Sequence, residues 1–314
     1  NNIENQLLKE FKINFSTSSN ISYRILPTPH FLIKDSKIFK ESGDKITLLS
    51  EIKNLKVFVT QTNFFDKAKM QLKEIKINNA NFTLLKDDFK LLYDISSNKL
   101  SNKKIEINNS NIFFKDNSNE IITIVKVNKA FLFFDNEKLL NLFNLHADIF
   151  KIPFIFNLKS QTDSSENKEI DISAKALKLK IFNQYNKVNK NFISGKNIIS
   201  FLNSTVSTKY NIEEDLISFE SRKSRLNKFQ INYSGKFSIK PFDLNLDIDL
   251  GNYKISKILY INSALLELIK TELLFNENIS INTSIITSST AKEEIFQNAK
   301  INFNIINGKI NFNK

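Results

Sequence analysis

The chain has 314 residues and a formal net charge of +12, from 45 basic and 33 acidic residues. It contains no cysteine, which excludes a disulfide framework and any thiolate metal site. No run of about 18 or more apolar residues occurs, so the sequence predicts no transmembrane helix. Five Gly, four Pro and no Trp beside 29 Phe indicate a codon bias towards A and T.

The basic charge comes almost entirely from lysine. The arginines are Arg24, Arg222 and Arg225, and the lysines are spread along the whole chain. Nucleic-acid surfaces usually depend on arginine forks and clustered charge. The distribution therefore disfavours a nucleic-acid partner.

The first residues predict a short helix followed by a kinked strand. In NIENQLLKEF the apolar residues recur at helical spacing, which is typical of an amphipathic helix. The next stretch, ISYRILPTPHFLIKDSKIF, contains Pro27 and Pro29, which cannot donate to a sheet ladder. We therefore expect an edge or kinked strand between extended flanks.

The sequence then contains one motif twice. IKINNANFTLLKD starts at Ile75 and IEINNSNIFFKD starts at Ile105, 30 residues later. In both copies the apolar residues occupy odd positions before an Asn-Asn pair and even positions after it. Asparagine tolerates the backbone conformations of a bend or bulge, so each copy is interpreted as two strand segments joined at an asparagine corner. The copies should form adjacent β units.

Alternation predicts which side chains share a face. In the two copies one concave apolar face should be lined by Ile75, Ile77, Phe82, Leu84, Ile105, Ile107, Ile112 and Phe114. The later stretch FDLNLDIDL alternates strictly, with Leu244, Leu246 and Ile248 on one face and polar residues on the other. These residues are the candidate apolar surface.

Other connections follow from local signals. The polar stretch from Ser160 to Glu169 predicts a hairpin loop between two strands, and Ser234-Gly235 and Asn307-Gly308 predict two-residue hairpin turns. The five isolated glycines are interpreted as turn residues. Ser263 is a plausible N-cap, so we expect a helix near residues 263–275.

Together these elements predict a mainly β protein, built on an elongated, curved, antiparallel sheet that forms a taco-like groove with a few short helices. Segments adjacent in sequence should be adjacent in space, as in a meander. We expect residues 1–160 to form a first groove unit with the repeated strands. Residues 161–314 should continue the sheet, with a second possible boundary near Lys187–Asn191.

The sequence contains no arrangement typical of an enzyme. His30 and His146 are the only histidines, and neither has an acidic or thiol partner at triad or ligand spacing. Single glycines do not make a phosphate loop, and no pair of acids is marked as catalytic. We expect no catalysis, cofactor or metal site.

Two architectures fit the alternating strands. In an ordinary β-sandwich the dry faces of two sheets pack on each other. In an open sheet the dry face remains a trough for an apolar ligand. Periodicity is compatible with both architectures. On the residues alone we favour the sandwich.

The segment YRILPTPHFLIKDSKIF resembles the N-terminal signature of AsmA-like proteins, with Pro27, Pro29 and Asp35 carrying the match best. The similarity continues through ITLLSEIKNLKVFVT, both asparagine copies and INYSGKFSIKPFDLNLDIDLGNYKISKIL, and so covers most of the chain. Family members are bacterial envelope proteins that extend through the periplasm from an inner-membrane anchor.

The resemblance implies a periplasmic β-groove, related to bridge-like lipid transfer proteins, along which the acyl chains of glycerophospholipids move towards the outer membrane. The family's N-terminal membrane anchor is absent from this sequence, which begins with Asn, and we expect it upstream.

Three hypotheses follow. The first is a non-enzymatic lipid conduit that contributes to outer-membrane biogenesis. The second is an envelope scaffold that binds partner proteins by strand addition. The third is a nucleic-acid binder that uses the distributed lysines.

Overall fold

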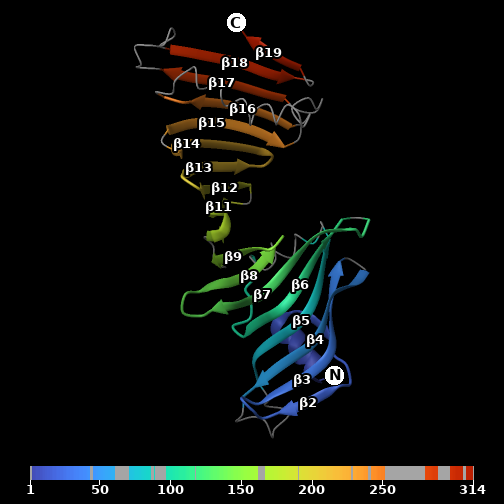
Figure 1. Ribbon diagram of the computed structural model, residues 1–314. Helices are drawn as coiled ribbons and strands as arrows, with labels where there is room; N and C mark the ends of the chain where they lie inside the picture. The colour runs from blue at the N-terminus through green and yellow to red at the C-terminus, as the bar shows by residue number, and fades with distance from the viewer. Residues whose placement is uncertain are drawn as a thin grey trace. The chain divides into compact units, whose positions relative to one another are not determined.

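The computed structural model describes residues 2–42, 45–60, 71–85, 88, 97–116, 118–161, 167–189, 191–227, 229–239, 242–251, 280–288, 298–306 and 309–313. The chain divides into two compact units, Asn1–Ala176 and Leu177–Lys314, called unit 1 and unit 2 (Figure 1). The predicted mainly β class is confirmed, because each unit is built on a curved, open and mainly antiparallel sheet.

Unit 1 begins with the predicted helix and continues as a sheet. The elements are α1 (Asn2–Phe11), β1 (Asn14–Ser16), β2 (Ile21–Arg24), β3 (His30–Ser42), β4 (Lys45–Val59), β5 (Leu72–Leu85), β6 (Lys104–Lys115), β7 (Ile121–Asp135), β8 (Leu140–Ile149), β9 (Ile152–Gln161) and β10 (Asn167–Ala174), followed by the 3₁₀ turn η3 (Lys175–Leu177). From β3 to β10 each strand pairs with the next, while β1 and β2 both pair with β3. The expected meander order is confirmed.

The two asparagine copies are the adjacent strands β5 and β6, as predicted. They pair in parallel, with Ile75 opposite Ile105 and Ile77 opposite Ile107. Asn79 and Asn109 have left-handed φ values of 56° and 47°, which shift the phase of alternation at the same level in both strands. The bend predicted at each asparagine pair is therefore confirmed, although each strand continues through it as one element instead of dividing into two.

The parallel register explains why the motif is repeated. It places the same residue of each copy side by side, so that Asn108 Nδ2 donates to Asn78 Oδ1 at 3.3 Å. The side chain of Asn111 donates to Asn81 Oδ1 at 3.0 Å in the same way. Such amide ladders form where identical residues stack in register. The repeated asparagines therefore hold the two copies in one alignment.

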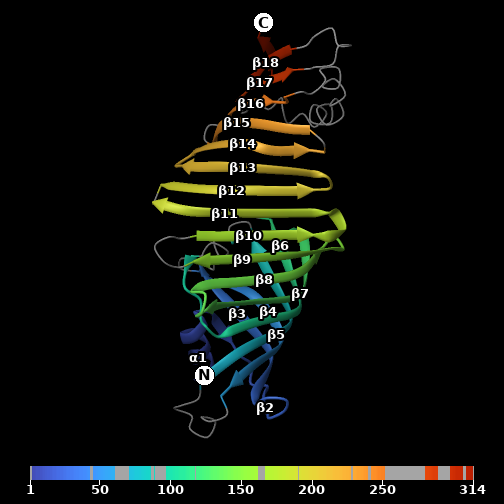
Figure 2. The same ribbon diagram turned by 90° about the vertical axis from the view of Figure 1, so that its left-hand side faces the viewer.

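Helix α1 packs on the apolar face of the sheet. Leu7 is fully buried in a cluster with residues of β1 and β3–β6, and Ile3 and Phe11 pack against the same cluster. The sheet of unit 1 curves around the helix (Figure 2). The helical spacing read from the sequence therefore marks a buried face, which stabilises a helix too short to persist alone.

Unit 2 is also built from sheet strands. Its strands are β11 (Leu179–Asn189), β12 (Phe192–Phe201), β13 (Ser204–Glu213), β14 (Leu216–Leu226), β15 (Phe229–Ile239), β16 (Phe242–Asp249), β17 (Ser280–Ser288), β18 (Asn298–Ile306) and β19 (Lys309–Asn313). Each pairs with the next in antiparallel fashion, except that β16 and β17 are parallel. At this parallel pair Asn282 Nδ2 donates to Asn245 Oδ1 at 2.9 Å.

Two two-residue hairpin turns were expected, and the structure supports one of them. Gly235 lies inside β15, which runs unbroken past it, so Ser234-Gly235 is not a hairpin turn. Ile306 lies opposite Lys309, which confirms the hairpin β18–β19, although its two turn residues lie outside the described residues. The helix expected near 263–275 also lies outside them.

The hairpin predicted across Ser160–Glu169 is the pair β9–β10 inside unit 1. The boundary expected between residues 160 and 161 therefore falls within a hairpin, and the two units divide at η3, between Ala176 and Leu177. The other expected boundary, Lys187–Asn191, coincides with the end of β11.

We predict that Leu7→Ala lowers the free energy of unfolding by about 2–5 kcal/mol, because it leaves a cavity between α1 and the sheet. The matched control is Leu8→Ala, whose side chain is 48% exposed on the same helix and should cost little. Urea denaturation followed by circular dichroism measures both. Equal losses would contradict the packing of α1 described above.

Candidate functional site

Cross-strand register assembles one apolar face in unit 1. Paired residues of neighbouring strands point to the same side of a sheet. One row across β4–β10 consists of Val57, Ile75, Ile105, Leu132, Phe143, Leu158 and Ile170. The next row consists of Leu55, Ile77, Ile107, Ala130, Leu145, Phe156 and Ile172.

The first part of this face is closed by α1. Ile75, Ile77 and Ile105 are buried in the cluster that contains Leu7 of the helix, and Phe82 and Ile107 pack against that cluster. Five of the predicted face residues therefore meet at one core. This part of the predicted surface serves to hold unit 1 together.

The second part of the face is less covered. Ile107, Ile112 and Phe114 are half-buried against a smaller cluster centred on Val127 and Ala147, and the residues of this cluster all come from β6–β9. Leu84, opposite Phe114 in the register, is also half-buried. Within the described residues this cluster, whose central Val127 and Ala147 are buried, takes its side chains from β6–β9 alone.

Unit 2 has the same two-faced character. In β16 the residues Leu244, Leu246 and Ile248 are half-buried while Asn245 and Asp247 are exposed, as the alternation predicted. Register extends this apolar face through a row of Ile193, Ile212, Ile217, Phe237, Leu244, Ile281 and Ile305. The candidate residues of β16 therefore belong to a continuous row.

A polar belt crosses this apolar face of unit 2. Tyr210 donates its hydroxyl to Asn183 Oδ1 at 3.0 Å, and Asn197, opposite Asn183, contacts the same oxygen at 3.5 Å. Burial raises the pKa of the Tyr210 hydroxyl, and the hydrogen bond to Asn183 opposes that change. The apolar face is therefore interrupted by hydrogen-bonding side chains.

Two glycines within strands of unit 2 make room for aromatic rings. Gly195 is the register partner of Tyr210, and a Cβ placed there would lie 2.4 Å from Tyr210 Cζ. Gly235 is the partner of Phe219, and a Cβ there would lie 2.3 Å from the carbonyl oxygen of Asn245. The rings of Tyr210 and Phe219 thus occupy the space beside Gly195 and Gly235. These glycines serve close packing, and their interpretation as turn residues is wrong.

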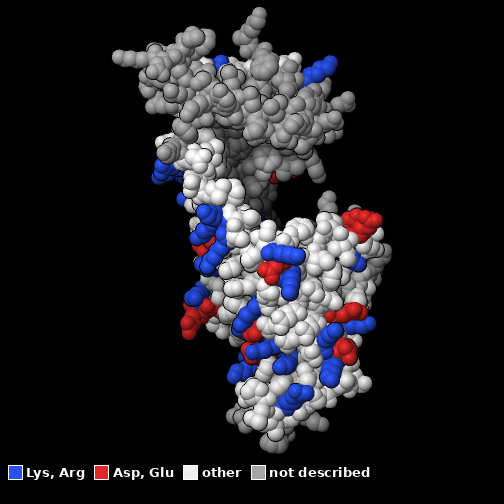
Figure 3. All heavy atoms as spheres, viewed as in Figure 1, with Lys and Arg blue, Asp and Glu red and all other residues white. Residues whose placement is uncertain are grey.

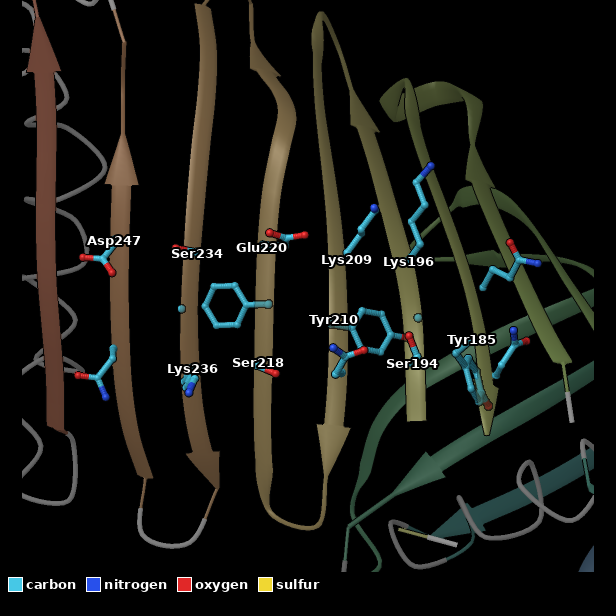
Figure 4. A pocket seen from close by; sticks show the side chains of 17 residues that line it. Tyr185, Ser194, Lys196, Lys209, Tyr210, Ser218, Glu220, Ser234, Lys236 and Asp247 are labelled. Atoms are coloured by element: carbon cyan, nitrogen blue, oxygen red, sulfur yellow. The ribbon is translucent and has the colours of Figure 1, made fainter. Parts of the chain in front are cut away.

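The opposite, polar face of unit 2 carries a hollow of about 930 Å³. It takes two polar positions from each of β11–β16, namely Gln184, Asn186, Ser194, Lys196, Lys209, Asn211, Ser218, Glu220, Ser234, Lys236, Asn245 and Asp247. Lys196 lies directly opposite Lys209, and the two side chains run side by side in Figure 4. Tyr185, Gly195, Tyr210, Phe219 and Gly235 complete the lining. Sequence reasoning missed the hollow because each strand contributes only two or three of its residues.

On the polar face of unit 1 three lysines surround the buried carboxylate of Glu106. Glu106 is 9% exposed, and its oxygens lie 3.2 Å from Lys104 Nζ, 3.7 Å from Lys76 Nζ and 3.9 Å from Lys129 Nζ. Burial raises the pKa of Glu106, but hydrogen bonds from Lys104 and Asn108 and the charge of Lys76 outweigh it and hold the pKa below its usual range. Figure 3 shows basic and acidic side chains interspersed over this unit.

The residues that carry the sequence resemblance lie on and beside the β2–β3 loop. Pro27 is exposed in this loop, and the carbonyl of Pro29 accepts from the Val59 N–H at 3.3 Å. Asp35 is exposed inside β3 with a φ of 54°. His30 is buried and donates from Nδ1 to the Thr28 carbonyl at 2.7 Å.

Within the described residues no three His, Asp or Glu side chains form a group that could hold a metal ion. His146 is exposed on β8. None of the helices in the described part of the chain is long and apolar enough to cross a membrane.

Comparison with known proteins identifies no family. No family model matches the chain, and no curated protein matches it. Among solved structures, the sex pheromone staph-cAM373 precursor aligns at a TM-score of 0.19 and 7% identity, covering 82% of this chain and 74% of that one. A sex pheromone precursor from Lactobacillus salivarius aligns at a TM-score of 0.20 and 11% identity, covering 87% and 70%. At such TM-scores neither likeness carries an argument.

We predict that Glu106→Gln lowers the free energy of unfolding at neutral pH by about 1–2 kcal/mol, because the lysines lose their shared carboxylate. A folded-state pKa below the unfolded value contributes stability above the unfolded pKa, and this stability is lost as the pH falls through the folded pKa. The difference between variant and wild type should therefore shrink below about pH 4.

Urea denaturation at several pH values measures this difference. Glu220→Gln is the control, because its pair with Arg222 at 3.5 Å is solvent-exposed and should contribute little at any pH. A constant penalty for Glu106→Gln across the acid range would contradict the electrostatic account.

Gly235→Ala should destabilise unit 2 by about 1–3 kcal/mol, because its Cβ meets backbone of the neighbouring strand. Gly195→Ala meets chiefly the far end of the Tyr210 ring, so adding Tyr210→Ala should remove much of its steric penalty. Thermal unfolding of the single and double variants tests both. A Gly235→Ala protein as stable as wild type would show that the strand pairing tolerates a side chain there.

Proposed function

We propose that this chain is a segment of a non-enzymatic lipid-transfer protein, whose apolar sheet face holds the acyl chains of glycerophospholipids. The observation that carries the proposal is the part of the two in-register apolar rows that lies beyond α1, on β7–β10, where Leu132, Phe143 and Ile170 are half-buried. On the same face of β6, Ile112 and Phe114 are half-buried too, and no second sheet is described over these strands.

The physical basis is simple burial. Each CH₂ group of an acyl chain removed from water gains about 0.8 kcal/mol, so a chain lying along these rows needs no polar catalyst to be held. A β-sandwich would bury the same side chains against a second sheet. At the centre of the β6–β9 cluster Val127 and Ala147 are buried, while the side chains around them, such as Phe156, are half-buried. The proposal assigns the acyl chain to this half-buried margin.

The resemblance of residues 23–39 to AsmA-like proteins points in the same direction. On this proposal the chain works in the periplasm, tethered to the inner membrane by a segment outside this sequence, and contributes to outer-membrane biogenesis. The polar belt at Asn183 and Tyr210 implies that the track in unit 2 is not uniform, so acyl chains would meet a hydrogen-bonding region there.

A second candidate is a scaffold that binds partner proteins by strand addition. It is favoured by β7, in which residues Ile121–Ile124 precede Val125, the first residue of β7 that pairs with β8. Ile122 is 64% exposed on this stretch. Backbone groups left without a neighbouring strand are suited to an added peptide strand.

The test is lipid retained by the purified chain. Phe114→Gln should lose bound lipid, because it places an amide on the apolar face, while the melting temperature changes little for a half-buried side chain. Phe113→Gln is the matched control, since Phe113 is half-buried on the opposite face of the same strand. Mass spectrometry of organic extracts measures the lipid.

Equal retention by the two variants would place the lipid elsewhere. A wild-type chain that carries no lipid, and crosslinks to none in a bacterial envelope, would overturn the proposal. A partner protein recovered without lipid would then support the scaffold.

A further inference from the structure

The β2–β3 loop presents apolar side chains to solvent. Leu26 is 81% exposed, the largest fraction among the large apolar side chains that the structure describes, and Ile25 beside it is 64% exposed. Scattered single exposed residues need no explanation, but two adjacent ones at a loop tip form a compact apolar point.

The loop is braced at its base. His30 is 3% exposed, stacks on Phe58 with ring centroids 5.0 Å apart, and donates to the Thr28 carbonyl at 2.7 Å. The carbonyl of Pro29 accepts from the N–H of Val59 on β4. The tip is therefore held out from the sheet by interactions that do not involve its apolar side chains.

A basic residue adjoins the loop. Arg24 is exposed and directly precedes Ile25, and at the other end of the β2–β3 pair the exposed Lys34 is followed by the exposed Asp35. Strand β2, which leads into the loop, lies at the lower end of unit 1 in Figures 1 and 2. On the face of unit 1 that Figure 3 shows, the basic side chains reach closer to that end than the acidic ones.

We propose that the tip at Ile25 and Leu26 docks unit 1 on the surface of a bilayer that contains anionic lipids. An apolar point that directly follows the exposed Arg24 fits a membrane interface, because the apolar side chains enter the acyl boundary while the guanidinium meets the phosphates. A protein partner would more often offer a groove or a strand edge. The lipid phosphates carry the negative charge in this contact. The acyl chains of the bilayer provide the apolar phase that Ile25 and Leu26 enter.

This docking is independent of the proposed transfer function. A chain that carries no lipid can still bind a membrane surface, and a chain that carries lipid can fail to dock. Vesicle binding and retained lipid are therefore separate measurements, and failure of either one leaves the other to be judged by itself.

The experiment is flotation of the full chain with vesicles of phosphatidylcholine, with and without phosphatidylglycerol. Wild type should float with the anionic vesicles, less so at high salt, and Leu26→Glu should reduce partitioning roughly tenfold or more. The control is Leu202→Glu, which alters a turn residue of unit 2 that is 60% exposed and should leave binding unchanged. Both variants should melt at the wild-type temperature, because neither side chain is buried.

Wild-type protein that floats equally poorly with both vesicle types would overturn the proposal. Leu26→Glu protein that binds as well as wild type would also overturn it. Sedimentation that shows a dimer lost in Leu26→Glu, without vesicle binding, would assign the tip to a second copy of the chain instead.

Discussion

In-register parallel pairing of β5 with β6 is the constraint on which the apolar face of unit 1 depends. Side chains alternate along a strand, so a slip of one residue would turn every isoleucine of one copy to the polar side. Asn79 and Asn109 shift the phase at the same level in both strands, which keeps the residues beyond them on the same face. Hydrogen bonds from Asn108 to Asn78 and from the Ala80 N–H to Ser110 Oγ oppose a slip.

A sheet that is apolar on one face needs something to cover it. In unit 1 the cover differs between two parts of the apolar face. Over Ile75 and Ile105 the helix α1 supplies Leu7, and the side chains are buried. Ile112 and Phe114 are half-buried, and no helix is described over them. On the proposed function, this part of the face would be covered by an apolar ligand.

Unit 2 uses the same plan with more polar interruptions. Its strands approach closely because Gly195 and Gly235 leave space for the rings of Tyr210 and Phe219. The Tyr210 hydroxyl then reaches Asn183 and adds a polar belt to the apolar face. A ligand that slides along apolar rows would exchange part of its hydrophobic contact for hydrogen bonds at this belt.

Local pattern was sufficient for much of this protein. Apolar spacing identified α1, strict alternation in β16 identified its dry face, and the asparagine slip located the kinks at Asn79 and Asn109. Each of these signals depends on residues a few positions apart, where backbone geometry alone relates sequence to side-chain direction.

Tertiary structure decided the remainder. Alternation is the same in parallel and antiparallel strands, so it did not reveal that β5 and β6 run in parallel. From the sequence, Gly235 is interpreted as a turn residue. In the structure, Phe219 of the neighbouring strand and the backbone of Asn245 occupy the space that a side chain at position 235 would need. Whether an apolar residue becomes core or open surface depends on what packs over it. Ile75 lies beneath α1 and Phe114 does not, because helix and strand meet only through long-range packing that no local spacing encodes.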